Sequence, residues 1–141
     1  MAENGQRTFD LSLVTPEGVA YEGEAEMLIV PGAAGEIGVL ARHAPLVAML
    51  KAGEIRVKTG GDWQTFAAGP GYCTIKQDRA VVLVDDAVRA EDIDVEQARR
   101  EVEEARALLE RAQAGDEEID RWHAEQRLRH AENKISVAGR G

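Results

Sequence analysis

The stretch Glu36–Leu50, EIGVLARHAPLVAML, decides how this chain is interpreted. It holds two apolar runs of strand character, separated by the polar pair Arg42 and His43. Proline lacks a backbone donor and disfavours helix for the residue before it, so the pair Ala44-Pro45 predicts a corner between two extended segments. Such a corner presents Glu36, Arg42 and His43 at one end of a β-structure, and we interpret that end as a docking surface.

Length and composition bound the class of protein. The chain has 141 residues, 44% of them hydrophobic and 30% charged, which is typical of one globular domain or one domain with a small appendage. A net charge of −9 disfavours nucleic acid and anionic membrane surfaces as direct partners, because both attract clustered Lys and Arg. No apolar run approaches the ~20 residues that span a bilayer. The opening residues show no apolar core of a secretory signal, so we expect membrane contact only through partner proteins.

The first ninety residues hold most of the turn-forming residues of the chain, as expected of a β-protein. All four prolines and eleven of the fourteen glycines lie there. Phe9, Leu11 and Leu13 alternate with polar neighbours, and Gly60-Gly61 is a strong hairpin signal. The apolar run Ala80–Val84 predicts a strand that is buried on both faces, and Cys73 is expected in the core. Regularly spaced strands with no helical pattern between them indicate a small antiparallel sandwich or barrel.

After residue 90 the apolar period changes to that of a helix. Apolar residues recur at three- and four-residue steps from Val95 to Ala112. Asp94 is a predicted N-cap, with Gln97 at the third helical position of a capping box. Gly115 is a predicted left-handed C-cap, and Asp116 is expected to cap a second helix directly after it. The chain is therefore predicted to end in a helix–break–helix hairpin.

The predicted hairpin has narrow, alanine-rich apolar stripes. In its second helix the stripe is interrupted by Gln126, and Trp122 is expected to pack between the helices, as Trp63 is in the sandwich. Residues 91–120 hold twelve acids against four bases, whereas residues 121–141 hold five bases against two acids. The charges either form solvated, mutually complementary faces or give a basic tip that seeks an acidic surface on another protein. A hairpin with so little core of its own can dock in more than one place.

Several motifs, in order along the chain, resemble the epsilon-subunit family of the F-type rotary ATP synthase. They include VTPEG at residues 14–18, GEIGVL at 35–40, HAPL at 43–46, GEIR at 53–56 and the pair Ile93-Asp94. The resemblance covers essentially the whole chain. It implies an α+β fold, with a ten-stranded antiparallel β-sandwich in residues 1–90 and a two-helix antiparallel hairpin in residues 91–141.

The resemblance also implies a non-catalytic rotor subunit of the central stalk, at the cytoplasmic face of the bacterial cell membrane. The sandwich is then expected to bind the gamma subunit and to rest on the ring of c subunits. Glu36 matches a residue on the c-ring side, and His43 matches a residue at the subunit-contact end. Arg42 adds a charge where members of the family have a Pro-Gly turn.

In this family the hairpin folds against the sandwich or extends into the alpha/beta catalytic head. There its basic second helix meets the beta subunit and blocks ATP hydrolysis, while the rotor couples proton flow to ATP synthesis. The expected inhibitory contacts of this chain are the four cations of the second helix: Arg121, Arg127, Arg129 and Lys134.

Some bacterial members bind ATP at an Ile/Leu-Asp-x-x-Arg-Ala motif. The match here is Ile93, Asp94 and Ala98, with Gln97 where the arginine belongs, so a guanidinium suited to phosphate is missing. The capping box already accounts for Asp94 and Gln97. Arg99 or Arg100 could substitute for the missing arginine, so a regulatory ATP site remains open, and no other cofactor or metal is implied.

Two other functions are alternatives for a chain with this pattern. The first is an independent β-sandwich binding module with a helical tail that forms a homodimer. The second is a hydrolase built on Asp85, Asp86 and His43, for which no nucleophile–base pair can be identified. The chain also lacks the glycine-rich phosphate loop of a P-loop ATPase and the ligand order of a helix–loop–helix calcium site.

Overall fold

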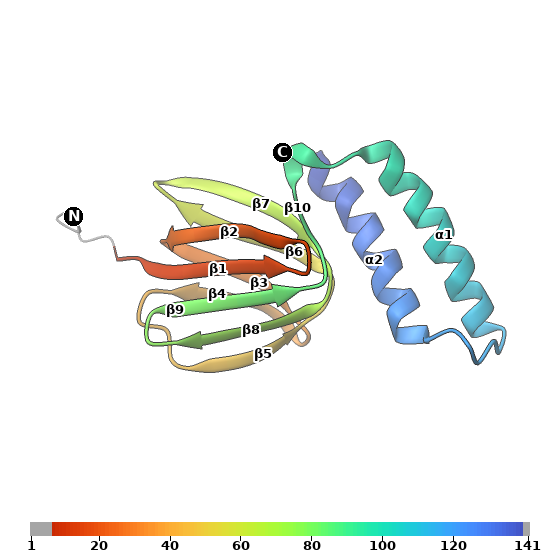
Figure 1. Ribbon diagram of the computed structural model, residues 1–141, viewed down its shortest axis with the longest axis horizontal. Helices are drawn as coiled ribbons and strands as arrows, with labels where there is room; N and C mark the ends of the chain where they lie inside the picture. The colour runs from red at the N-terminus through yellow and green to blue at the C-terminus, as the bar shows by residue number, and fades with distance from the viewer. Residues whose placement is uncertain (1–6, 140–141) are drawn as a thin grey trace.

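A computed structural model of the chain describes residues 7–139. The opening residues and Arg140, one of the five bases counted above, lie outside this part. Ten strands come first and are followed by two long helices that lie beside one end of the strands (Figure 1). The strands are β1 (Phe9–Thr15), β2 (Gly18–Ala25), β3 (Met27–Gly32), β4 (Gly35–Leu40), β5 (Leu46–Leu50), β6 (Gly53–Thr59), β7 (Asp62–Ala68), β8 (Gly71–Lys76), β9 (Arg79–Val84) and β10 (Ala87–Arg89). A 3-10 turn, η2 (Ala90–Asp92), leads to α1 (Val95–Gln113) and α2 (Arg121–Ala138).

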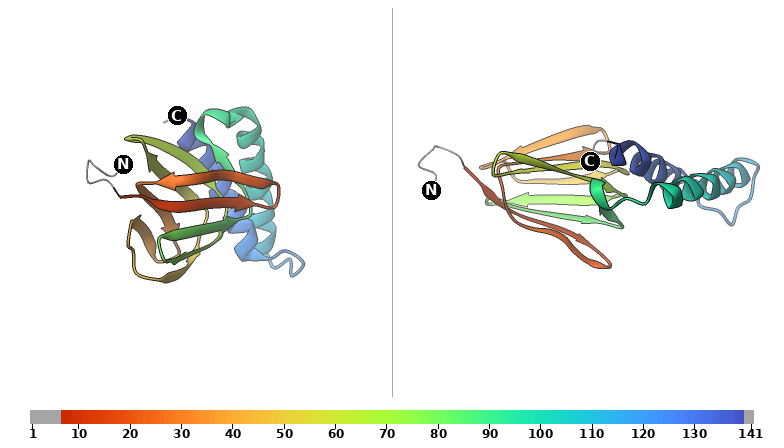
Figure 2. Two further views of the ribbon diagram at one scale, coloured as in Figure 1. Left: turned by 60° about the vertical axis from the view of Figure 1, so that its left-hand side comes forward. Right: turned by 90° about the horizontal axis from the view of Figure 1, so that it is seen from above.

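The strands form one hydrogen-bonded sheet in the order β10-β7-β6-β3-β5-β8-β9-β1-β2, with β4 paired to β3. The sheet folds over into a β-sandwich, and the helices project from it (Figure 2). The predicted fold, a ten-stranded sandwich followed by a helical hairpin, is confirmed. One pairing differs from the antiparallel expectation, because β1 runs parallel to β9 from Asp10 opposite Arg79 to Val14 opposite Leu83. Parallel neighbours need a long connection, and seven intervening strands provide it here.

The main core is built by the inward faces of the strands. Its buried members are Phe9, Leu11, Leu13, Ala25, Leu28, Val30, Val39, Leu50, Ile55, Val57, Phe66, Ala68, Cys73, Ile75, Ala80, Val82 and Val84. Cys73 is a core residue, as predicted, and burial raises the pKa of its thiol to about 11. The prediction that Ala80–Val84 is buried on both faces is wrong, because Leu83 is exposed on the outer face of β9. Trp63 is also exposed, and it lies beside the cationic ends of Arg56 and Lys58 rather than in the core.

Tight turns at the far end of the sandwich need left-handed backbone. Gly60 and Gly61 have φ of 60° and 82°, so the predicted hairpin turn is present. Arg42 has φ of 66° and occupies the turn in which His43 N donates to Leu40 O at 3.2 Å. The corner of the Glu36–Leu50 stretch therefore lies at residues 40–43, earlier than predicted from Ala44-Pro45. An arginine occupies a backbone conformation that glycine adopts without strain.

The first helix has the predicted ends. Asp94 Oδ1 accepts a hydrogen bond from Gln97 N at 3.1 Å, which caps α1. Gly115, at φ of 102°, follows the helix, and the amide of Asp116 donates to Arg111 O at 3.1 Å. This is the Schellman arrangement, which satisfies carbonyl groups at the end of a helix.

The second helix begins later than predicted. Its N-cap is Asp120, whose Oδ1 accepts from His123 N at 3.1 Å. Asp116 cannot act as the N-cap of α2, because its carboxylate accepts a hydrogen bond from Glu118 N and pairs with Arg111 within the loop. Trp122 is exposed on the first turn of α2, so the expectation that it packs between the helices is wrong.

Candidate functional site

The residues predicted to share one docking end lie at opposite ends of β4. Glu36 is the second residue of β4. It lies near the β5–β6 connection, where Lys51 N donates a hydrogen bond to Pro31 O. Arg42 lies two residues after the last residue of β4, and the Arg42 amide donates to the Asp78 carboxylate in the β8–β9 turn. Because a strand advances ~3.3 Å per residue, the four steps from Glu36 to Leu40, where the turn with Arg42 begins, span ~13 Å. The sequence interpretation of a single docking end was therefore wrong.

Each end presents its own exposed groups. Glu36 is exposed and lies 4.0 Å from Arg56 Nη2, a distance at which an exposed pair contributes little stability. Beside it is an apolar recess between the β3–β4 turn and β5. At the other end Arg42 is exposed, whereas His43 is half-buried with its Nδ1 2.7 Å from Ala44 O.

An exposed apolar stripe crosses three neighbouring strands. Met49 on β5, Tyr72 on β8 and Leu83 on β9 stand directly opposite one another, and they are 65%, 48% and 39% exposed. Val47 adds a further exposed side chain on β5. Sequence reasoning missed this stripe, although the five apolar residues of β5 left that strand no polar outer face. Contiguous apolar surface of this kind is typical of protein–protein contacts.

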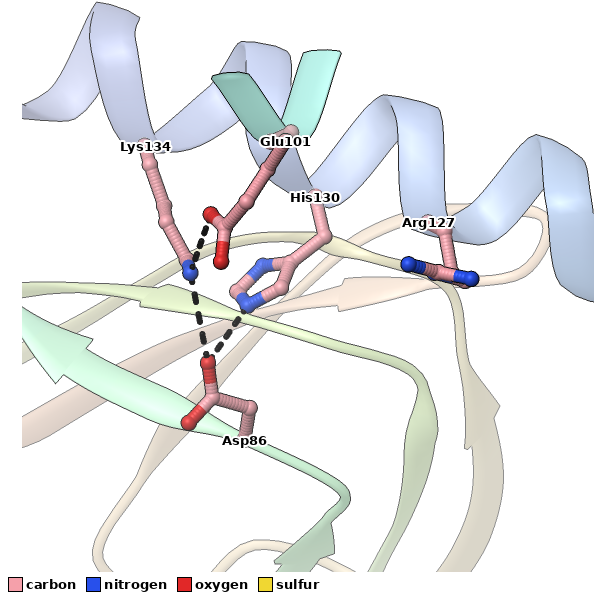
Figure 3. A pocket seen from close by; sticks show the side chains of 6 residues that line it. Asp86, Glu101, Arg127, His130 and Lys134 are labelled. Atoms are coloured by element: carbon pink, nitrogen blue, oxygen red, sulfur yellow. Dashed lines mark hydrogen bonds and ion pairs between the residues drawn. The ribbon is translucent and has the colours of Figure 1, made fainter. Parts of the chain in front are cut away.

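The four predicted inhibitory cations do not form one patch. Arg127 and Lys134 are seven residues apart, about two helical turns, and both line a small pocket between α2 and the sandwich (Figure 3). Arg129 lines a recess between the helices, and exposed Arg121 pairs with Glu125 at 3.3 Å. In this hairpin position the cations therefore divide between two faces of α2.

The four residues of the expected ATP site do not converge on one point. Asp94 is occupied as the helix cap, and Ala98 is buried. Ile93 packs beside Val137, whereas Arg99 is exposed and pairs with Glu96 at 2.7 Å. Arg99 therefore does not take the place of the missing arginine in this conformation.

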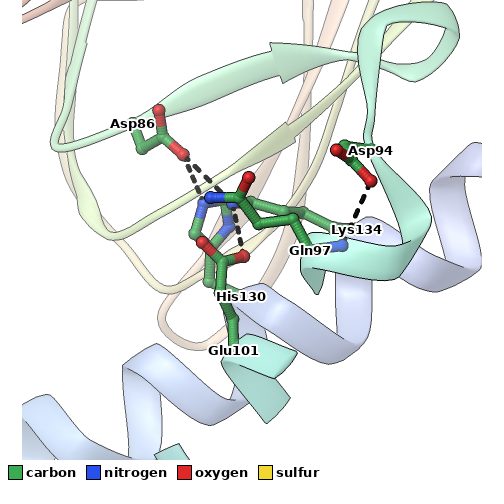
Figure 4. A network of polar contacts seen from close by, with 6 residues as sticks. All are labelled: Asp86, Asp94, Gln97, Glu101, His130 and Lys134. Atoms are coloured by element: carbon green, nitrogen blue, oxygen red, sulfur yellow. Dashed lines mark hydrogen bonds and ion pairs between the residues drawn. The ribbon is translucent and has the colours of Figure 1, made fainter. Parts of the chain in front are cut away.

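A network of charged side chains joins the hairpin to the sandwich. It consists of Asp86 from the β9–β10 connection, Glu101 from α1, and His130 and Lys134 from α2, and we refer to it as the Asp86 network (Figure 4). His130 Nε2 lies 2.7 Å from Asp86 Oδ2. Lys134 Nζ lies 3.0 Å from Glu101 Oε1 and 3.7 Å from Asp86 Oδ2. The hydrogen bond from His130 holds the pKa of Asp86 below its ordinary value, against the opposing effect of burial.

Two further contacts hold α2 against the end of the sandwich. Buried Gln126 accepts a hydrogen bond from Ala52 N at 2.7 Å through its Oε1. Val137 is fully buried in a small cluster with Ala67 and Ala90 that is separate from the main core. Together with the Asp86 network, we call these the docking contacts. Gln126, which interrupts the apolar stripe, was the sequence signal for this face of α2.

The described residues show neither a membrane-crossing helix nor a metal cluster. Between residues 7 and 139, no helix is both long enough and apolar enough to cross a bilayer. In the same range, His, Cys, Asp and Glu side chains nowhere form a group of three that could hold a metal ion.

The fold and these contacts define a β-sandwich protein with a C-terminal helical hairpin docked at one end. Two family models, for the beta-sandwich domain and the long alpha-helix domain of the ATP synthase delta/epsilon chain, match residues 8–90 and 91–139. The chain therefore belongs to the delta/epsilon chain family of the ATP synthase.

Individual relatives cover nearly the whole chain. It is 42% identical to the ATP synthase epsilon chain of Desulforamulus reducens, over 94% of this chain and 98% of that relative. It is 33% identical to that of Synechocystis, with 94% and 97% covered. A chain in the Euglena gracilis mitochondrial ATP synthase structure is 26% identical, with a TM-score of 0.74 over 92% of this chain and 81% of that one. A central stalk and c-ring structure from Tetrahymena thermophila matches at 9% identity and a TM-score of 0.54, and supports the fold alone.

Proposed function

We propose that the chain is a non-catalytic subunit of the central stalk of a bacterial ATP synthase. Its sandwich fixes it to the rotor, which couples proton flow to ATP synthesis, and its hairpin inhibits ATP hydrolysis. The observation that carries this proposal is the separation of the two parts. Every buried member of the main core comes from a strand, whereas α2 packs against one end of the sandwich through the docking contacts described above.

The sandwich offers two surfaces to partner subunits. We assign the apolar stripe of Met49, Tyr72 and Leu83 to the gamma subunit, because burying it removes apolar surface from water. We assign Glu36, near the start of β4, to a contact with the c ring. Arg42 and His43, beyond the end of β4, are assigned to a separate contact. These partners place the chain at the cytoplasmic face of the membrane, attached through other subunits.

The assignment of the stripe can be tested by co-purification. Met49→Glu places a charge in the stripe and should reduce recovery of the chain with the gamma subunit. Val19→Glu is the matched control, because Val19 is similarly exposed but lies on the edge strand β2. Equal recovery of the two variants would reject the stripe as the contact.

The hairpin is suited to a second position. Lys134 is held by Glu101 and Asp86 in the docked position, and Arg127 lines the same pocket. Movement of α2 away from the sandwich would separate both cations from Asp86 and allow them to meet an acidic segment of the beta subunit. Arg121 and Arg129 would extend this basic surface. Such a contact between charged groups is weakened by salt.

The experiment for the brake is ATP hydrolysis by the assembled enzyme. Removal of residues 91–141, or replacement of Arg121, Arg127 and Arg129 by alanine, should raise hydrolysis while assembly remains intact. The control variant replaces three exposed arginines of α1 by alanine: Arg99, Arg106 and Arg111. If hydrolysis is unchanged in both test variants, the brake is rejected.

A further inference from the structure

The Asp86 network contains a histidine, the residue type whose charge ordinarily changes near neutral pH. We propose that the network is a proton-sensitive latch, in which protonated His130 holds the hairpin on the sandwich and deprotonated His130 loosens it. The latch concerns the docked state described here, and only its consequence for ATP hydrolysis rests on the proposed function.

Asp86 is the ionic anchor of the sandwich for this latch. It lies in the β9–β10 connection, whereas its partners His130 and Lys134 both come from α2. The side chains of these partners are only 14% and 15% exposed. Solvent and salt therefore screen the contact less than they screen an exposed ion pair. Breaking this contact is necessary if α2 is to leave the sandwich.

His130 is surrounded by more acids than fixed cations. Two fixed cations, Lys134 and Arg127, line the pocket with His130. The surrounding acids number three: Asp86, Asp85, which interacts electrostatically with His130, and Glu101. A protonated imidazole balances this set at three charges of each sign, and its deprotonation leaves one negative charge in excess. His123 also influences Asp85, but its own side chain is exposed and pairs with Asp120.

The state of His130 also sets the strength of its bond to Asp86. The Asp86 carboxylate is ionised in both states, so this bond is charge-assisted throughout, and protonation of the imidazole adds the attraction between opposite charges. Nδ1 of His130 is buried with no partner among the described residues. Protonation turns it from an unpaired acceptor into an unpaired donor, so the attraction of His130 to the surrounding acids has to exceed this cost. Histidine changes charge between about pH 5 and pH 8, so acidification within this range should tighten docking and alkalinisation should loosen it.

The amide of Ala52 reports docking directly, because it donates to Gln126 of α2. Hydrogen exchange at this amide, measured by NMR on the full chain and corrected for intrinsic rates, gives a protection factor at each pH. We expect the protection to be progressively lost between about pH 5.5 and pH 7.5, in step with the pH-dependent change in the chemical shifts of the His130 ring. Protection of Ile55, a buried position of β6, should stay constant and show that the sandwich remains folded.

Two variants isolate the latch. His130→Gln keeps a neutral donor and should abolish the pH dependence at Ala52, whereas His123→Gln, on the same helix, should retain it. A wild-type protection factor independent of pH, or a pH dependence that persists in His130→Gln, would overturn the proposal. If His130→Gln does not fold, the wild-type comparison decides, because an Ala52 transition that does not coincide with the His130 titration also overturns it. None of these results depends on inhibition of ATP hydrolysis.

Discussion

Replacing Gln126 by leucine should release the hairpin without unfolding the sandwich. Gln126 and Ala52 are both buried, and the bond between them is 2.7 Å long. Leucine is similar in size but cannot accept a hydrogen bond, so the Ala52 amide would be left unsatisfied in the docked state. An unsatisfied buried group costs about 1–3 kcal/mol. The ratio of undocked to docked hairpin should therefore rise about five- to 150-fold.

Spin labels at Lys76 and Glu132 provide the assay, because both residues are exposed and they lie on the sandwich and on α2 respectively. Pulsed dipolar distances then give the docked and undocked populations. Cys73 does not interfere, since it is buried and the raised pKa of its thiol keeps it unreactive. Glu125→Leu is the control, because it makes the neighbouring change on the exposed side of α2. If Gln126→Leu and Glu125→Leu give the same populations, the reasoning is refuted.

Three further predictions concern Asp86, a glycine of β8 and the turn at Arg42. His130 lowers the pKa of Asp86 in the docked state. The Asp86 carboxylate therefore contributes fully to docking above the ordinary aspartate pKa of ~3.9, and this contribution is lost as the pH falls through the lowered pKa. The spin-label distances should thus shift to undocked in strong acid, and Asp86→Asn should remove this acid transition. Gly71→Ala should reduce the free energy of unfolding in urea by at least ~2 kcal/mol, because a Cβ at Gly71 would lie 1.9 Å from a backbone oxygen of β9. Gly38→Ala, whose Cβ would have its nearest neighbour at 3.5 Å, should be much less costly. Arg42→Gly should be about 1 kcal/mol more stable to urea than Arg42→Ala, since only glycine adopts φ of 66° without strain, and equal stabilities would contradict this.

Features fixed by neighbouring residues could be predicted from the sequence. The turn at Gly60-Gly61, the cap at Asp94 and the helix end at Gly115 each depend on a few adjacent residues, and all three are present. The start of α2 was misplaced, because Asp116 and Asp120 are equally good caps by type. The loop hydrogen bonds of Asp116 decided between them.

Features that depend on strand pairing could not be predicted. Glu36 and His43 are close in sequence, but the intervening residues form an extended strand that separates them. Leu83 was expected to be buried because its neighbours are apolar, yet the helices pack at one end of the sandwich and leave the outer face of β9 open. Asp86 and His130 are 44 residues apart, and only the docking of α2 brings them together.

The strand-only composition of the main core has a consequence for how the molecule comes apart. Because the helices contribute no buried residue to its main core, the sandwich can stay folded when the hairpin unfolds, moves away or is removed by proteolysis. Heating should accordingly melt the chain in two calorimetric steps, a small early one for the tail and a larger late one for the sandwich. Substitutions in the hairpin can then change how strongly it docks while the sandwich stays folded.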